Sequence, residues 1–156
     1  MNPLLPYWLI VAHLIGDYAL QSHVMATRKT SSLYWAAVHA LFYSLPFAAL
    51  LSQLDLAPER AGYALAIIGG THAVIDRYVL ARRWCQFYGV GHPGVWWSLV
   101  RGWWLLWDQG ERGEDDLSPE PEFAMPPPFI GTWLVIVVDN AAHLAINGLA
   151  IAWALA

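Results

Sequence analysis

Histidine and aspartate side chains recur at helical spacing within the apolar stretches of this sequence. The pairs with a four-residue spacing are His13 and Asp17, His72 and Asp76, and Asp139 and His143. Residues four apart lie on the same face of an α-helix, so each pair forms part of a polar stripe on an apolar helix. Imidazole and carboxylate groups are the usual ligands of zinc, manganese and iron in proteins. The pattern therefore predicts one or two divalent metal ions.

The predicted metal site consists of these six residues and one further histidine of the apolar stretches. These residues are His13, Asp17, His39, His72, Asp76, Asp139 and His143. Four further polar side chains are expected to orient the ligands or a substrate: Gln21, Arg77, Asn140 and Asn147. Each ionisable group inside a bilayer costs about 2.5 to 3.5 kcal/mol on insertion scales. Seven such groups therefore require one another, water or a bound cation as partners.

The composition indicates a membrane protein. Of the 156 residues, 58% are hydrophobic and only 13% are charged, whereas about a quarter of the residues of a soluble domain are charged. Ten tryptophans and seven tyrosines add to this, because amphipathic rings collect at membrane interfaces. The net charge of -4 is modest and comes mostly from the acidic residues of 108–128, which argues against a nucleic-acid partner.

Four apolar segments are long enough to position these stripes across a bilayer. The predicted spans cover residues 3–22, 33–54, 61–81 and 129–155. Five tryptophans within residues 93–107 predict an additional helix in the plane of the headgroups. Residues 108–128 form an acidic, proline-rich linker. The predicted fold class is all-α, a single integral membrane domain over residues 1–156 built as a four-transmembrane-helix bundle with a Trp-rich interfacial helix.

The basic residues predict the orientation of the bundle. The segments after the first and third spans hold seven of the eight basic residues, among them Arg28 and Lys29, which we interpret as topology determinants. The positive-inside rule places these segments in the cytoplasm and both termini outside the cytoplasm. The expected location is a bacterial inner membrane, crossed several times. In this topology the ionisable groups of all four spans lie at a similar depth, which predicts that they meet.

Four blocks of residues carry a resemblance to a known family. They are the segment from Ala12 to Ser22 with its His-x3-Asp-x3-Gln pattern, His39-Ala40, the segment from Thr71 to Tyr78, and the segment from Asp139 to Asn147. In this order they resemble an uncharacterised domain-of-unknown-function family of small bacterial and phage membrane proteins. The resemblance implies the fold and marks the polar residues, and it implies no activity. More distantly, the His and Asp pairs look like those of membrane-bound metal-dependent hydrolases.

Three functions are compatible with these residues. The leading hypothesis is metal-dependent hydrolysis of a membrane-embedded ester or phosphoester, with membrane lipid as partner and Asp17 or Asp76 as general base. In this hypothesis the metal is held by His13, His72, Asp139 and His143. The alternatives are a non-enzymatic accessory or scaffold subunit that binds a larger membrane complex through the Trp-rich segment, and a proton or metal-ion conductor.

Overall fold

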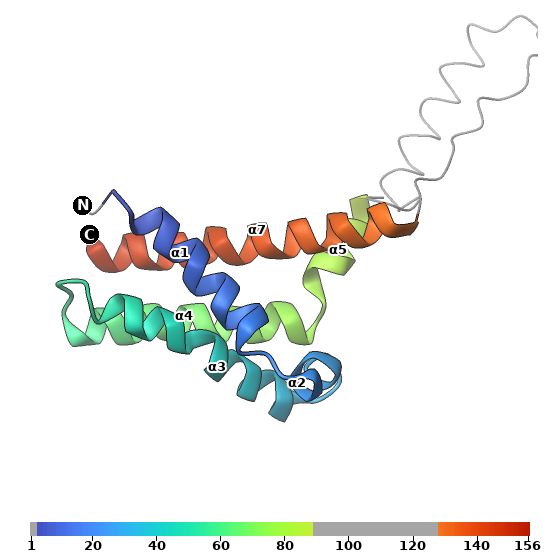
Figure 1. Ribbon diagram of the computed structural model, residues 1–156, viewed down its shortest axis with the longest axis horizontal. Coiled ribbons are helices and arrows are strands. Elements are labelled where there is room, and N and C mark those ends of the chain that lie inside the picture. Colours follow the sequence, from blue (N-terminus) through green and yellow to red (C-terminus); the bar gives the residue numbers. More distant parts are fainter. Residues whose placement is uncertain (1–2, 89–127) are drawn as a thin grey trace, which may run out of the picture. The chain divides into compact units, whose positions relative to one another are not determined.

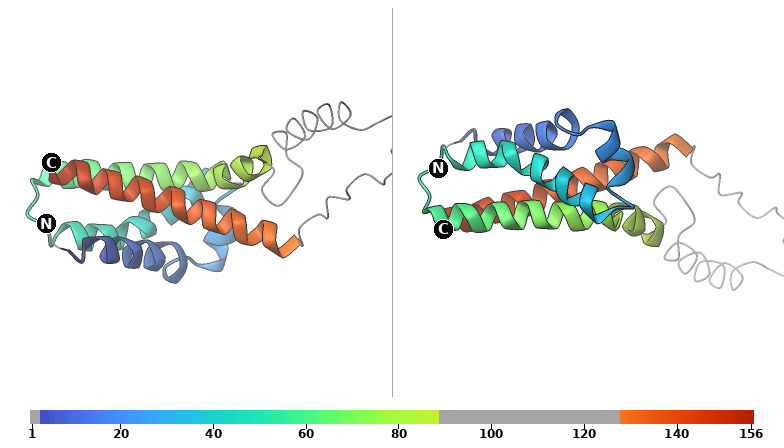
Figure 2. Two further views of the ribbon diagram at one scale, coloured as in Figure 1. Left: turned by 90° about the horizontal axis from the view of Figure 1, so that it is seen from above. Right: turned by 90° about the horizontal axis from the view of Figure 1, so that it is seen from below.

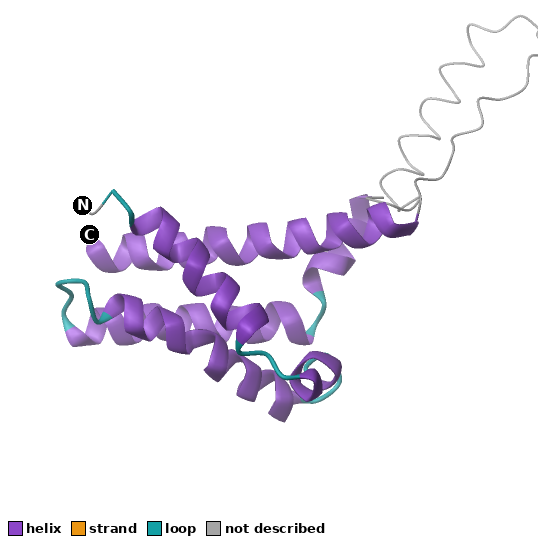
Figure 3. Ribbon diagram, viewed as in Figure 1, coloured by secondary structure: helices purple, strands orange, loops and turns teal. Residues whose placement is uncertain are grey.

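The computed structural model describes residues 3–88 and 128–156, and every regular element within these residues is helical (Figure 3). The predicted all-α fold class is confirmed for them. The predicted Trp-rich helix at residues 93–107, and the linker at 108–128 up to its last residue, lie outside the described residues. The chain divides into two compact units, Met1–Leu80 with Asn140–Ala156, and Ala81–Asp139.

The first predicted span is an α-helix that widens into a π-helical turn. Helix α1 (Leu5–Leu14) has a proline in its first turn, where the missing N–H costs no hydrogen bond. The π-helix η1 (Ile15–Ala19) follows, and the amide of Leu20 donates to the carbonyl of Ile15 at 2.9 Å. A Cβ atom on Gly16 would lie 2.7 Å from the carbonyl oxygen of Tyr43. Glycine therefore permits the close approach of η1 to the next long helix.

Two serines begin the next helices. Ser22 caps α2 (His23–Arg28), which lies in a segment that the sequence leads us to expect as a loop. Ser32 caps α3 (Leu33–Leu51) by accepting a hydrogen bond from the amide of Trp35 at 3.5 Å. Helix α3 continues through Pro46 and ends three residues before the predicted span does.

Helix α4 (Pro58–Arg77) begins with a proline and packs closely against α3. A Cβ atom on Gly69 would lie 2.6 Å from the Oγ atom of Ser44. The helix ends at Arg77, four residues before the predicted span does, and Val79 has a φ of 50°. This conformation is strained for a β-branched residue and breaks the helix before α5 (Leu80–Tyr88).

Helix α7 (Pro128–Leu155) closes the chain, and its residues from Asn140 onward belong to the first unit. Within this unit α1, α3, α4 and the end of α7 alternate in direction (Figures 1 and 2). Both termini lie at the same end as the turn between α3 and α4, and α2 lies at the other end.

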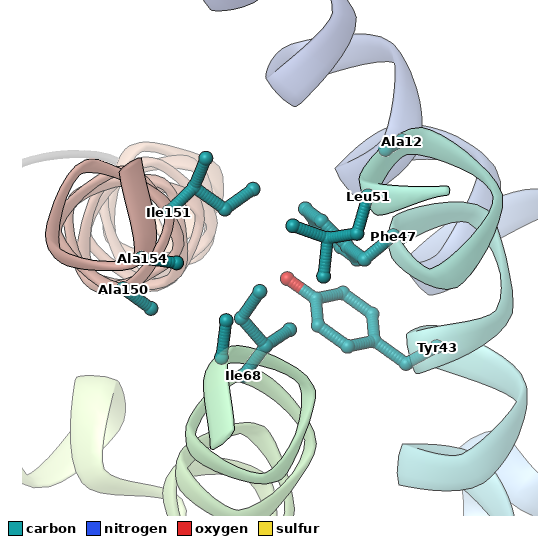
Figure 4. Packing of buried hydrophobic residues seen from close by; sticks show 9 residues of the cluster. Ala12, Tyr43, Phe47, Leu51, Ile68, Ala150, Ile151 and Ala154 are labelled. Carbon is teal, nitrogen blue, oxygen red and sulfur yellow. The ribbon is translucent and has the colours of Figure 1, made fainter. Parts of the chain in front are cut away.

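The apolar core of the first unit lies at the end that holds the termini. It is formed by α1, α3, α4 and α7 through Ala12, Tyr43, Phe47, Leu51, Ala64, Ile68, Ala150, Ile151 and Ala154. Figure 4 shows the aromatic side chains of α3 directed toward Ile68 of α4 and Ile151 of α7. The small residues of α7 allow its backbone to approach closely, as is usual for helices that pack within a bilayer.

In the second unit, α5 buries Cys85 and exposes Trp84 and Phe87.

Two helices among the described residues are long and apolar enough to cross a membrane, α3 and residues Gly131–Leu155 of α7. A third span results if α4 and α5 together count as one bent span.

Candidate metal centre

Six of the seven predicted metal ligands come together in the first unit. One of these six is Asp17. The remaining five are His13, His39, His72, Asp76 and His143, and all six side chains are buried. They come from α1, η1, α3, α4 and α7, which are the elements that carry the three polar stripes and the second predicted span. Asp139 lies one helical turn before His143 on α7, is half-buried and belongs to the second unit.

Four of these side chains bring one possible ligand atom each close to those of the other three. Asp17, His39, His72 and Asp76 offer atoms that all lie within 4.8 Å of one another. The Nε2 atoms of His39 and His72 are 3.0 Å apart. Asp76 Oδ2 lies 3.3 Å from His39 Nε2 and 3.2 Å from His72 Nε2. Asp17 Oδ1 lies 3.2 Å from His39 Nε2 and 3.8 Å from His72 Nε2.

These five separations are close to the edges of a tetrahedral metal site. A zinc ion with ligands at about 2.0 to 2.2 Å separates its ligand atoms by about 3.3 to 3.6 Å. The five separations given above run from 3.0 to 3.8 Å. The set of two imidazoles and two carboxylates can therefore hold a divalent ion with small side-chain adjustments, and the carboxylates neutralise its charge.

His143 supports His72 from behind. The Nδ1 atoms of these two histidines are 3.3 Å apart, and His143 Nε2 lies 3.6 Å from Asp76 Oδ1. When His72 Nε2 faces a metal, its Nδ1–H donates to His143 Nδ1, so the proton of His143 is on Nε2 and faces the carboxylate of Asp76. This arrangement fixes the tautomer of a ligating histidine, as outer partners commonly do. It also forms a continuous chain of three imidazoles with His39.

His13 has both ring nitrogens in hydrogen bonds outside the four-atom set. Its Nε2 donates to Asn140 Oδ1 at 2.7 Å, and its Nδ1 is 2.9 Å from the hydroxyl of Tyr43. Because an amide oxygen only accepts, the neutral His13 is protonated on Nε2 and the Tyr43 hydroxyl donates to Nδ1. Asn147 Nδ2 then donates to the Tyr43 oxygen at 2.6 Å. The predicted supporting roles of Asn140 and Asn147 are consistent with these bonds.

Two other predicted supporting residues bond to the backbone. Gln21 Nε2 donates to the carbonyl oxygen of Asp17 at 2.9 Å, which secures the end of the π-helical turn. Arg77 donates to the carbonyl oxygen of Thr30 and holds the segment before α3 against the end of α4. Arg77 is next to the candidate ligand Asp76 in sequence, so this bond also holds the end of the helix that carries Asp76.

Two residues of the site, Lys29 and Tyr43, are not among those that the sequence predicts for it. Lys29 directs its Nζ atom to Asp76 Oδ2 at 2.7 Å, to His39 Nε2 at 3.3 Å and to Asp17 Oδ1 at 3.7 Å. Tyr43 is fully buried, and its ring stacks on that of His72 with centroids 3.5 Å apart. Tyr43 follows His39 by four residues on α3, a spacing that places it on the same face. Lys29 carries the weaker signal, because a basic residue between spans normally indicates topology alone.

The comparisons with known proteins identify the family. The family model of DUF3307, described as a protein of unknown function, matches residues 5–85. No curated protein and no solved structure matches the chain. The matched region holds all four side chains that meet at the centre, together with Lys29 and Tyr43. The chain therefore belongs to DUF3307, a family of proteins of unknown function.

Proposed function

We propose that this protein is an integral membrane protein that binds one zinc-like divalent ion through Asp17, His39, His72 and Asp76. The single observation that carries the proposal is the set of five ligand-atom separations of 3.0 to 3.8 Å, which are close to the edges of a tetrahedron of zinc ligands. Surface clusters of acids are common without a metal, whereas these four side chains are all buried. Two buried carboxylates need positive charge close to them, and one divalent ion that is also bound by neutral imidazoles supplies this charge.

The distribution of side chains supports a lipid environment for this site. Helix α3 exposes large apolar residues such as Leu41 and Leu45 while it buries His39. A soluble helix shows the opposite arrangement. The alternating direction of the helices in the first unit agrees with four spans whose two termini share one side of the membrane (Figure 2). We place that side outside the cytoplasm of a bacterial inner membrane, because Arg28 at the end of α2 and Lys29 directly after it lie at the opposite end.

A cobalt titration of the detergent-purified protein tests this proposal. Cobalt(II) takes zinc sites readily, and its visible absorption reports tetrahedral coordination. We expect saturation at about one equivalent in the wild type and loss of the signal in His39→Ala. The matched control is His23→Ala, because His23 is an exposed histidine on α2. Equal absorption by both variants, or none in the wild type, would refute the proposal.

A second candidate function is hydrolysis of a membrane-embedded ester or phosphoester. Asp17 Oδ1 has the longest separation in the set, 3.8 Å from His72 Nε2. If Asp17 remains unligated, the ion has three protein ligands, and such an ion supplies an activated water at its fourth position. Asp17 would then accept the proton of that water as general base.

Asp17→Asn separates these two candidates. A closed site with four protein ligands predicts that Asp17→Asn weakens zinc binding together with the other ligand variants. The hydrolytic site predicts that Asp17→Asn keeps about one equivalent of zinc and loses hydrolysis of lipid or phosphoester substrates. Zinc content and hydrolysis are measured on the same preparation, and Asp55→Asn serves as the control because Asp55 lies in the turn between α3 and α4.

A further inference from the structure

Lys29 contacts the same atoms that we assign to the metal. Its Nζ atom lies 2.7 Å from Asp76 Oδ2, 3.3 Å from His39 Nε2 and 3.7 Å from Asp17 Oδ1. The ammonium group of Lys29 therefore covers the face of the site that three of the four proposed ligand atoms form. The side chain of Lys29 is 17% exposed, whereas those of Asp17 and Asp76 are 7% and 5% exposed. Lys29 thus enters the site from its more accessible side.

The ammonium group and a metal ion compete for the same negative charge. The two carboxylates carry two negative charges, and Lys29 supplies one positive charge against them. An ion at about 2 Å from each ligand atom would lie roughly 3 Å from Nζ in its present position. Two cations at this separation repel strongly in a buried site, where screening by solvent is weak. The present position of the ammonium group and a bound dication therefore exclude each other.

We infer that Lys29 is a resident counter-cation, which covers the carboxylates of Asp17 and Asp76 and is displaced when a divalent metal ion binds. This inference rests on the proposed metal site and says how metal binding there is regulated. The metal ion must take the place of the Lys29 ammonium group. Without metal, the lysine prevents two buried carboxylates from facing each other unpaired. With metal, the lysine side chain turns away toward solvent.

The local structure gives Lys29 room for this movement. Lys29 follows the last residue of α2, a helix of six residues in which Met25 is the buried side chain. The next residue, Thr30, is held through its carbonyl by Arg77. The backbone directly after Lys29 is therefore bound to α4. The lysine side chain itself has four rotatable bonds and is partly exposed to solvent. Displacement requires rotation of the side chain and no rearrangement of the helices that carry the ligands.

Zinc affinity in lysine variants tests the exchange. Lys29→Met keeps the length of the side chain and removes its charge, so we expect zinc to bind at least about tenfold more tightly than in the wild type, measured by competition with a chelator. Lys29→Arg keeps the charge and should not tighten binding. Arg28→Met is the matched control, since it removes an exposed neighbouring charge. Unchanged or weaker zinc binding by Lys29→Met would overturn the inference and leave the metal site in place. No zinc in any variant, including the wild type, would overturn both.

A second measurement needs no substitution at the site. Lys29 is the only lysine in the sequence, so an amine-acylating reagent labels this residue and the N-terminal amine alone. We expect zinc to increase the acylation of Lys29 relative to the N-terminus, as measured by mass spectrometry, because the displaced ammonium group becomes accessible. His39→Ala should show no zinc dependence. Zinc that leaves the labelling of the wild type unchanged, or lowers it, would contradict displacement.

Discussion

At the residue scale, Tyr43 links the two halves of the buried polar network. Its hydroxyl bonds to His13 and Asn147, and its ring stacks on the candidate ligand His72. The hydroxyl therefore donates to the unprotonated Nδ1 atom of His13, while the ring contacts a candidate metal ligand. These two functions separate in a single substitution, because phenylalanine keeps the ring and removes the hydroxyl.

We expect Tyr43→Phe to lower the free energy of unfolding by about 1 to 3 kcal/mol, because the buried atoms His13 Nδ1 and Asn147 Nδ2 lose their hydrogen bonds to the Tyr43 hydroxyl. Zinc binding should persist, since the ring remains stacked on His72. Denaturant unfolding in detergent measures the first effect, and the cobalt titration measures the second. Tyr63→Phe is the control, because Tyr63 is 63% exposed. Equal stability of the two variants would show that the Tyr43 hydroxyl has no structural importance.

The identity of the ligands at this scale is predicted in part from the sequence. The spacing of His13 and Asp17, or of His72 and Asp76, marks polar stripes on helices. Spacing does not reveal which ring nitrogen is engaged elsewhere, so His13 and His72 are equivalent in the sequence and different in the structure. The contacts of Lys29 are missed for the same reason: its basic charge is visible in the sequence, and its partners Asp17, His39 and Asp76 are not.

At the element scale, the π-helical turn η1 positions Asp17. A straight continuation of α1 would turn the following residues by the regular helical angle, and the wider turn changes the direction in which Asp17 points. The turn packs directly on the backbone of α3 at Gly16. The sequence predicts one continuous span here, because neither glycine nor aspartate specifies a π-helical turn by itself.

The close approach at Gly16 leads to a prediction about helix packing. Gly16→Ala places a Cβ atom 2.7 Å from the carbonyl oxygen of Tyr43, and backbone atoms on both sides must shift. We expect a loss of about 1 to 3 kcal/mol in the free energy of unfolding, and weaker zinc binding because Asp17 moves with the turn.

Gly62→Ala is the matched control for this prediction. An added Cβ at Gly62 has no neighbour within 4 Å among the described residues, and alanine is a better helix former than glycine by about 1 kcal/mol. This variant should be as stable as the wild type or more stable. If both glycine variants behave alike in unfolding and in zinc titration, the packing of η1 against α3 does not determine the site.

At the scale of the whole molecule, the fold class follows from composition and from the length of the apolar segments. Residues 33–54 and 129–155 have few charges and are found as the long helices α3 and α7. The break at Val79 is not visible in the sequence, because no glycine or proline stands at Tyr78, Val79 or Leu80 to mark the end of a helix. The meeting of six ionisable side chains in the first unit is predictable, since the expected topology brings the polar stripes of the spans to a similar depth.

The proposed topology leads to a prediction for the intact chain. With four spans and both termini outside the cytoplasm, alkaline phosphatase fused to the C-terminus should be active, and green fluorescent protein fused at the same place should not fluoresce. The same reporters on a cytoplasmic C-terminus give the reverse result, which would contradict the proposed orientation. Insertion of four arginines into the turn between α3 and α4 should weaken the preference for this orientation, because this turn is the non-cytoplasmic loop in the proposal.

The central claim is that four buried side chains form a metal site, and elemental analysis of the folded, detergent-purified protein tests it most directly. We predict about one equivalent of zinc or a similar divalent ion in the wild type, and loss of that ion in folded His72→Ala and Asp76→Ala. His13→Gln should retain the metal, because both nitrogens of His13 are engaged by Tyr43 and Asn140. A folded wild type without metal, even after incubation with zinc, would contradict the claim and favour the chain of imidazoles as a path for protons.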